Sequence, residues 1–578
     1  MFDLLALLAA HLVSSVIQRN ALLAGSVLED LATWFGYPTT AWLAVGLLVL
    51  LGSLYRAVGS AKERVLWQDY SRRLGPVWGK YFWLIAAGFW VPERMIDSNS
   101  GYTNIDPAHP LSDLLLMLDW SRTFLALALL RRLLSGSASK ENIESVQPLF
   151  KASHTAIVVL ASGLIAMVLQ FGVLGNIPRV QDEIIQQWQG RLYAQGRLHT
   201  ESFPVLESFM PDPSIEGNQV GMYSVYQPAY ALLLSMASPV GAEGVLNPLL
   251  LLASCVLLFL LFRNSHGRPL ANSALLLLAI SPFFIIMGAS RMNHFLGLFW
   301  FLGICLGFLC AARGRVFQGV ILTGLTLGAL LLTRRVEAAA VLASLSISCF
   351  FLPQSLFRRG LYLAGTWTFV IAAFLAQRTW ATWTCADPLQ MFRHAQVAVG
   401  HLANIQPDLL WNNFCDNFFG LSFWGFGGLL PAWAGFFRLW RKKNPDDPSS
   451  TALERFMVLH GCFLILIYAG YYFQDFCYGP RFYFPLLPAV ALGWGKIFQD
   501  LKEAGFPSPI KRLFLPAAAL SIFIVSQQVW ANLGNDYWHI RPEFQKFLET
   551  QAPKPSLIFL RHPARVRLQL LRRLRHKG

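Results

Sequence analysis

The sequence predicts an all-α polytopic membrane protein, and three observations carry that prediction. The chain of 578 residues is 55% hydrophobic. Only 14% of its residues are charged, whereas soluble domains have roughly 25%. Apolar runs long enough to cross a bilayer recur along the whole length. The net charge of +15 is also found in nucleic-acid-binding proteins, but basic residues kept on the cytoplasmic side of a membrane explain it. We therefore expect membrane lipids, and no nucleic acid, as partners.

The apolar runs indicate about 15 spans, each of about 15–22 residues. We expect residues 1–152 to form an N-terminal extension of four spans. Residues 153–530 would form a helical core of about 11 spans, and residues 531–578 a basic tail or small outer subdomain. The predicted spans are 4–18, 40–56, 79–93, 112–131, 154–175, 246–263, 271–289, 295–312, 317–333, 336–352, 361–377, 417–438, 456–472, 484–499 and 513–530.

The distribution of basic residues sets the expected orientation. With the N-terminus inside, and with the C-terminal tail and Arg122 left out of the count, the inner connections hold 25 Lys and Arg residues and the outer ones 11, as the positive-inside tendency requires. This orientation places two large loops outside, at 176–245 and 378–416. The basic tail does not fit, so either a span is miscounted or the tail is translocated. We favour translocation, because long translocated segments escape the charge rule.

The first outer loop opens with an acidic pair, Asp182 and Glu183, in the stretch "RVQDEIIQQWQGRLYAQGRL". Apolar residues after the pair recur at helical spacing, which predicts an amphipathic helix lying flat in the headgroup region. The expected apolar face holds Ile184, Ile185, Trp188 and Leu192, and the opposite face holds mostly Gln186, Gln187, Arg191 and Gln195.

Two interpretations of Asp182 remain open from the residue types. As an N-cap it would stabilise the helix by roughly 1 kcal/mol. As a general base it would take a proton from an acceptor hydroxyl while a lipid-linked sugar is attacked. Glu183 would orient Asp182 or the acceptor, or bind a divalent cation.

Five segments in order resemble membrane glycosyltransferases of the GT-C type, in particular the aminoarabinose transferase and protein O-mannosyltransferase group (glycosyltransferase family 39-like). After the "DE" pair and its helix come "YSVYQPAYALLLSMASPVGAEGVLNPLL", "SPFFIIMGASRMNHFLGLFWFL", "GLTLGALLLTRRVEAAAVLA", "NNFCDNFFGLSFWGFGG" and "YGPRFYFPLLPAVALGWG". The resemblance covers about residues 154–560. It departs at Arg334–Arg335, where the family usually has Arg-Pro.

The resemblance implies inverting transfer of a sugar from a polyprenyl-phosphate donor, with Asp182 as the base. It also implies an integral protein of the bacterial inner (cytoplasmic) membrane, active on the periplasmic or exterior face. The acceptor would be an envelope lipid, a glycan or a protein.

A polyprenyl-phosphate donor needs cations or hydrogen-bond donors at the outer surface. Arg334 and Arg481 are the main candidates for this phosphate site because both lie in family-like motifs. Arg335, Arg291 and His294 are further candidates. The alternatives are arginines that reach lipid headgroups and a histidine that simply ends a helix.

For the sugar we expect contacts from Tyr223, Tyr226 and Gln227, although aromatic residues near lipid are also common interface anchors. The sequence specifies no cofactor and matches no metal motif. The outer loops nevertheless contain residue types that bind a divalent cation: Asp387, His394, His401, Asp416 and Asp475.

Two rival functions stay open at this stage. A transporter or flippase of polyprenyl-linked sugars would also have many spans and outer arginines, but such transporters often show matched halves with interrupted helices, and the sequence shows no internal repeat. A non-catalytic scaffold of an envelope-synthesis complex would use the N-terminal spans to dock its partners.

Overall fold

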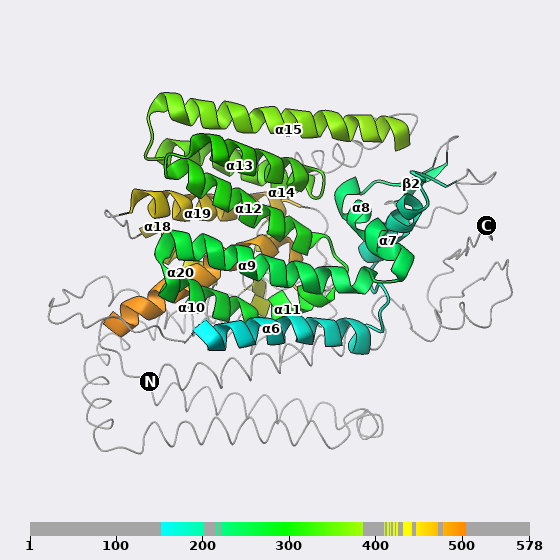
Figure 1. Ribbon diagram of the computed structural model, residues 1–578, viewed down its shortest axis with the longest axis horizontal. Helices are drawn as coiled ribbons and strands as arrows, with labels where there is room; N and C mark the ends of the chain where they lie inside the picture. Colours follow the sequence, from blue (N-terminus) through cyan, green and yellow to red (C-terminus); the bar gives the residue numbers. More distant parts are fainter. Residues whose placement is uncertain are drawn as a thin grey trace, which may run out of the picture.

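A computed structural model provides the structure of the protein (Figure 1). It describes residues 152–200, 215–217, 221–384, 432–441, 447–471 and 478–503, together with residues 410, 413, 414, 417, 420, 421, 424 and 425. The four predicted N-terminal spans, the predicted span 513–530, the tail and most of the loop 378–416 lie outside the described residues.

The described part is a bundle of helices with one small antiparallel hairpin, as the sequence predicts for an all-α membrane protein. The helices are α6 (Ala152–Val168), α7 (Gln181–Ala194), α8 (Pro228–Ala237), α9 (Leu246–His266), α10 (Arg268–Ala279), α11 (Pro282–Ala289), α12 (His294–Ala312), α13 (Val316–Leu331), α14 (Arg335–Ser348), α15 (Leu356–Thr384), α18 (Ala432–Arg441), α19 (Pro448–Ala469) and α20 (Leu487–Glu503). The hairpin pairs β1 (Ile215–Gly217) with β2 (Met222–Ser224). Shorter turns are a π-helix at Leu169–Val173 and 3-10 helices at Ser238–Val240, Glu243–Val245, Cys349–Phe351 and η7 (Arg481–Leu486).

Five of these helices are long and apolar enough to cross a membrane, or six if one bent pair counts as a single span, among the described residues. The long helices α6, α9, α12, α13 and α15 run roughly side by side (Figure 1). The helices α7 and α8 and the hairpin lie together at one end of the bundle, which we call the α7 end (Figure 1).

One predicted span is broken. Residues 271–289 were expected to form a continuous helix, but α10 and α11 bend by 63° at the break between them. Pro282 explains the break because its ring removes a backbone donor and disfavours a helical residue before it. Ser281 caps the new helix, and its side-chain oxygen accepts a hydrogen bond from the Phe284 N–H at 3.3 Å.

The predicted end of another span is wrong. A span at 361–377 followed by an outer loop from 378 was expected, but α15 continues to Thr384. Its last turns reach the α7 end, where the indole nitrogen of Trp380 donates to the hydroxyl of Tyr193 at 3.1 Å. Part of the predicted second loop is therefore helix, and this helix braces α7.

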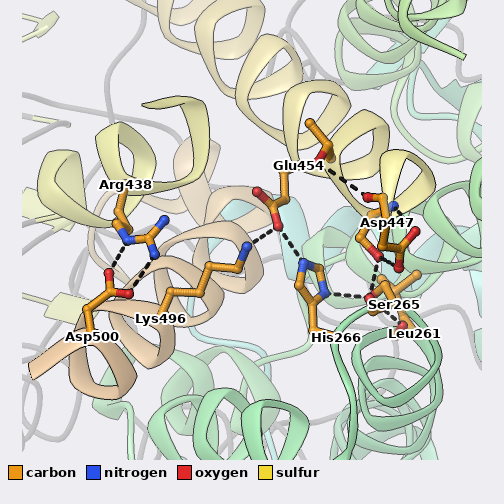
Figure 2. A network of polar contacts seen from close by, with 10 residues as sticks. Leu261, Ser265, His266, Arg438, Asp447, Glu454, Lys496 and Asp500 are labelled. Atoms are coloured by element: carbon orange, nitrogen blue, oxygen red, sulfur yellow. Dashed lines mark hydrogen bonds and ion pairs between the residues drawn. The ribbon is translucent and has the colours of Figure 1, made fainter. Parts of the chain in front are cut away.

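The opposite end of the bundle is tied together by buried charges (Figure 2). Glu454 of α19 accepts from Nε2 of His266 at 2.5 Å and pairs with Lys496 of α20. Arg438 of α18 binds Asp500 of α20 through two contacts of 2.5 and 2.9 Å. These pairs join α9, α18, α19 and α20, and we call them the far network.

Candidate functional site

The acidic pair lies at the start of α7, but Asp182 is not its N-cap. The N-cap is Val180, so Asp182 is the second residue of the helix and Glu183 the third. Glu183 Oε2 accepts from the N–H groups of Arg179 at 2.7 Å and Val180 at 3.4 Å. The capping interaction predicted for Asp182 is thus made by Glu183, reaching back from the third position.

Glu183 also ties α7 to the bundle. Its Oε1 accepts from the backbone N–H of Arg291 at 2.7 Å, and its side chain is buried. Burial raises the pKa of this carboxyl, and the N–H donors of Arg179 and Arg291 oppose that rise. A carboxylate held in this way is positioned to orient the helix start that carries Asp182.

Asp182 is the accessible member of the pair, with 26% of its side chain exposed. Its Oδ2 lies 3.2 Å from a terminal nitrogen of Arg481, and its Oδ1 accepts a hydrogen bond from the hydroxyl of Tyr226. Arg481 itself is only 3% exposed and begins η7. Three candidates far apart in the sequence therefore meet at one carboxylate.

Arg334 lies in a second polar group at the N-cap of α14. Its Nε–H donates to Glu337, one turn later, and its NH1 donates to Asn293 Oδ1 at 2.7 Å. The hydroxyl of Tyr468 lies 3.4 Å from NH2. Gly297 of α12 leaves room for this pair, because a Cβ there would lie 2.9 Å from both Arg334 Cδ and a Glu337 oxygen.

Aromatic rings connect the two arginines. The guanidinium of Arg481 lies 5.3 Å from the centroid of the Phe482 ring, which stacks on Tyr468 at 4.6 Å. His294 lies 6.1 Å from the centroid of the same ring. The imidazole is buried, and neither of its nitrogens has a hydrogen-bond partner among the described residues.

Asn247 of α9 holds the turn that precedes Asn293 and His294. The amide of Asn247 donates to the carbonyl oxygens of Ser290 at 2.6 Å and Met292 at 2.9 Å. Arg291 faces away from the Arg334 group and donates to Gln187 at 2.8 Å and to the Asn176 carbonyl at 2.6 Å. Arg291 is therefore built into the scaffold beneath α7.

Arg335 points toward α8 and α15 rather than toward Arg334's partners. With the amides oriented to satisfy their neighbours, Gln377 accepts from its NH2 at 2.8 Å and Gln227 accepts from its Nε at 3.1 Å. Gln227 is also the N-cap residue of α8. Tyr223 is fully buried and packs against Ala381. Tyr226 is the one of the three predicted sugar contacts that touches Asp182.

The amphipathic prediction for α7 is wrong in part. Ile185 and Leu192 are buried, but Ile184 is 40% exposed. The side chains of Gln186, Gln187 and Gln189 are buried instead, and Gln189 donates to the Tyr226 carbonyl at 3.3 Å. The helix lies on protein, and a second glutamine, Gln187, donates to Glu243 Oε1 at 3.4 Å.

Positive charge predominates at this site. Five arginines that are buried or half-buried, at positions 179, 291, 334, 335 and 481, accompany four carboxylates, at positions 182, 183, 243 and 337, among the described residues. Such an excess in a low-dielectric setting favours an anion. The described residues contain no group of three His, Cys, Asp or Glu side chains arranged to hold a metal ion. The five outer His and Asp residues considered for a metal lie outside the described part.

Several residues of the site were not anticipated from sequence. Glu337 could have been found, since it follows Arg334 at the spacing of one helical turn. Asn293 lies beside a predicted candidate in "RMNHF". Tyr468 and Phe482 had no distinguishing signal, because aromatic residues are abundant throughout this chain.

No family model matches the chain, and a search of curated proteins finds no match. Among solved structures, the oligosaccharyltransferase of Archaeoglobus fulgidus is 15% identical, with a TM-score of 0.40 over 70% of this chain and 59% of that enzyme. ArnT, the aminoarabinose transferase of Cupriavidus metallidurans, solved with undecaprenyl phosphate, is 14% identical. Its TM-score is 0.44, over 65% of this chain and 64% of ArnT.

The chain is similar to membrane glycosyltransferases of the GT-C fold. It spans less than two thirds of the length of either of these enzymes. At these identities the likeness assigns no role to any residue of this chain, so the chemistry has to come from the site itself.

Proposed function

We propose that this chain is an inverting membrane glycosyltransferase that moves a sugar from a polyprenyl-phosphate donor to an acceptor hydroxyl. The observation that carries the proposal is the meeting of Asp182, Tyr226 and Arg481 beside Arg334 and His294. A partly exposed carboxylate can remove a proton, while buried cations stabilise a phosphate.

In the proposed reaction Asp182 takes the proton of the acceptor hydroxyl. The acceptor oxygen forms a bond to the anomeric carbon of the donor, and the bond from that carbon to the phosphate oxygen breaks. The electron pair leaves with the polyprenyl phosphate, and attack from the opposite face inverts the anomeric configuration. Negative charge moves to the phosphate, so cations fixed near it lower the barrier.

We assign the phosphate site to Arg481, Arg334 and His294. Arg481 and His294 lie beside the Phe482 ring, and Arg334 donates to Tyr468, which stacks on that ring. Arg481 and Arg334 supply charge, and the unsatisfied ring nitrogens of His294 can hydrogen-bond a phosphate oxygen. Arg291 and Arg335 have supporting roles, since their guanidinium groups hold the loop beneath α7 and the cap of α8. Tyr226 orients Asp182 and lies where the sugar and acceptor would meet it.

The acceptor that we propose is an envelope lipid, a glycan or a protein reached from the outer face of a bacterial inner membrane. The division of basic residues along the sequence supports that side. Glu183 holds the start of α7 and positions Asp182, and this accounts for its burial without a metal.

One observation favours a transporter, the broken helix pair α10–α11. Transporters built from inverted repeats place such breaks in matched pairs around the substrate. In the described residues there is one broken pair. Its break, at Ser281, precedes α11, whereas His294 follows α11 in the sequence. The enzyme accounts for Asp182, Arg481 and His294 together, whereas the transporter accounts for the break alone.

The test compares cells that lack the gene with wild-type cells by mass spectrometry of envelope glycans and glycolipids. We expect one sugar substituent to disappear and to return with the wild-type gene but not with Asp182→Asn at equal expression. If the Asn variant restores the substituent fully, the proposed base is wrong. If deletion moves an unchanged sugar lipid to the inner leaflet, the protein is a transporter.

A further inference from the structure

The pairing of the proposed base with a proposed phosphate ligand has a consequence for the order of binding. Both oxygens of Asp182 are engaged, one by Arg481 and one by the hydroxyl of Tyr226. An acceptor hydroxyl would have to displace one of these donors. A carboxylate held by both donors is therefore masked from the acceptor.

We infer that the donor's phosphate unmasks Asp182 by replacing it on Arg481, so that the donor binds before the acceptor can be deprotonated. This inference rests on the proposed function, because it assigns Arg481 to the phosphate and Asp182 to the acceptor. It makes Arg481 the residue that links donor binding to the base.

The difference in burial decides which partner moves. Arg481 is 3% exposed, begins η7 and lies over the Phe482 ring, so its guanidinium stays in place. Asp182 is 26% exposed and lies in the first turn of α7, with solvent on one side. When an anion binds Arg481, the carboxylate is the group that can turn away.

A phosphate can bind Arg481 more strongly than the Asp182 carboxylate does. It offers several oxygens to a guanidinium, and paired N–H···O contacts of this kind are stronger than a single contact. Arg334 and His294 flank the same pair of stacked rings as Arg481, because His294 lies 6.1 Å from Phe482 and Arg334 donates to Tyr468. We assign all three groups to one anion. Asp182 touches only Arg481 among those three groups in the described structure.

The experiment measures binding of undecaprenyl phosphate to the purified full-length protein in nanodiscs of neutral phosphatidylcholine. If Asp182 competes with the phosphate, Asp182→Asn should bind the lipid about three- to tenfold more tightly than wild type. The matched control is Asp447→Asn, which makes the same change of charge at the cap of α19, where Asp447 accepts from Ser449 N and Ser450 N at 3.1 Å. It should leave the affinity unchanged, since Asn caps a helix about as well as Asp.

A double-mutant cycle separates a specific pair from general charge repulsion. In the Arg481→Gln background, Asp182→Asn should no longer tighten binding. A gain that persists there, or no gain in the single variant, overturns the inference and leaves the donor site intact. Absence of binding by wild type and all variants overturns the proposed function together with it. Asp182→Ser, which also lacks the charge, repeats the test if the Asn variant does not fold.

Discussion

The two ends of the helix bundle both contain buried charged side chains, but the ends differ in how far their polar groups are paired and exposed. In the far network, Glu454 is 2% exposed and is bound by His266 and Lys496 together, and Arg438 binds Asp500 through two nitrogens. At the α7 end, Asp182 is partly exposed and His294 has two ring nitrogens without hydrogen bonds in the described part of the chain.

The difference separates stability from function. Buried charges that are paired with one another specify how helices pack, and the fold loses stability when one member of a pair is removed. Incompletely satisfied polar groups gathered beside an accessible carboxylate contribute little to folding, and they are typical of a site prepared for a ligand. Substitutions at the far network should therefore change the folded fraction, while substitutions of Asp182, Arg481 and His294 should change binding and turnover.

The largest expected effect is that of Asp182→Asn. General-base assistance typically contributes 10²–10⁴-fold, so turnover should fall by about that factor. Unfolding temperature should not change, because the side chain is partly exposed and the helix is capped by Glu183. Transfer by the purified variant, measured with the donor identified from the deletion strain, checks this. Near-wild-type turnover would mean that Asp182 has a structural role, and that the α7 end does not differ in function from the far network.

The opposite outcome is expected for Glu454→Gln. The change leaves Lys496 buried without its carboxylate, and removing one partner of a buried pair costs about 3–5 kcal/mol. Thermal unfolding in detergent should show a lower midpoint, whereas transfer per folded molecule should match wild type. The double variant Glu454→Gln with Lys496→Met should recover much of the stability. A loss of turnover without a loss of stability would mean that the far network takes part in function.

Much of this architecture was predictable because it depends on local pattern. Apolar runs indicated α9, α12, α13 and α14 to within a few residues, since a span must be long and apolar. The break before Pro282 was visible as a residue type, yet hydropathy alone gives no weight to a single proline. The glutamine face of α7 was mispredicted because the helix packs on protein, and a periodic pattern does not distinguish lipid from a polar protein surface.

The candidate site was predictable as residue types but not as a geometry. Sequence pattern singled out Asp182, Arg481, Arg334 and His294, and their functional roles remain predictions. Nothing in the order of residues indicated that Arg481 would contact Asp182, because that contact joins segments at opposite ends of the core. Nor did residue type distinguish Arg334, which has a buried carboxylate partner, from Arg335, which has glutamine partners.

A smaller effect, confined to binding, is expected for Arg481→Ala. Hydrogen bonds to charged groups contribute about 1.5–3 kcal/mol, so affinity for undecaprenyl phosphate should fall by about ten- to a hundredfold. Stability should change little, because the carboxylate left behind is partly exposed. Arg334→Ala is the informative counterpart, since it leaves Glu337 buried and should also destabilise the protein. Unchanged affinity in both variants would make these arginines structural partners of Asp182 and Glu337 without a role in binding the phosphate.

The smallest effect, and the finest test of the contrast, is that of His294→Phe. Replacing a buried polar group that lacks a partner by an apolar ring of similar shape is nearly neutral or stabilising for the fold. The unfolding temperature should therefore stay the same or rise. If His294 hydrogen-bonds the donor phosphate, affinity for undecaprenyl phosphate should nevertheless fall about three- to tenfold, because one hydrogen bond contributes about 1 kcal/mol.

His460→Phe is the matched control. His460 is also buried, stacks on Phe301 at 4.3 Å and lacks a partner for either ring nitrogen in the described structure, but it lies within α19, away from Arg481. Equal losses of affinity in the two variants would show that the losses come from changed packing of the bundle. His294 would then not be a ligand of the phosphate.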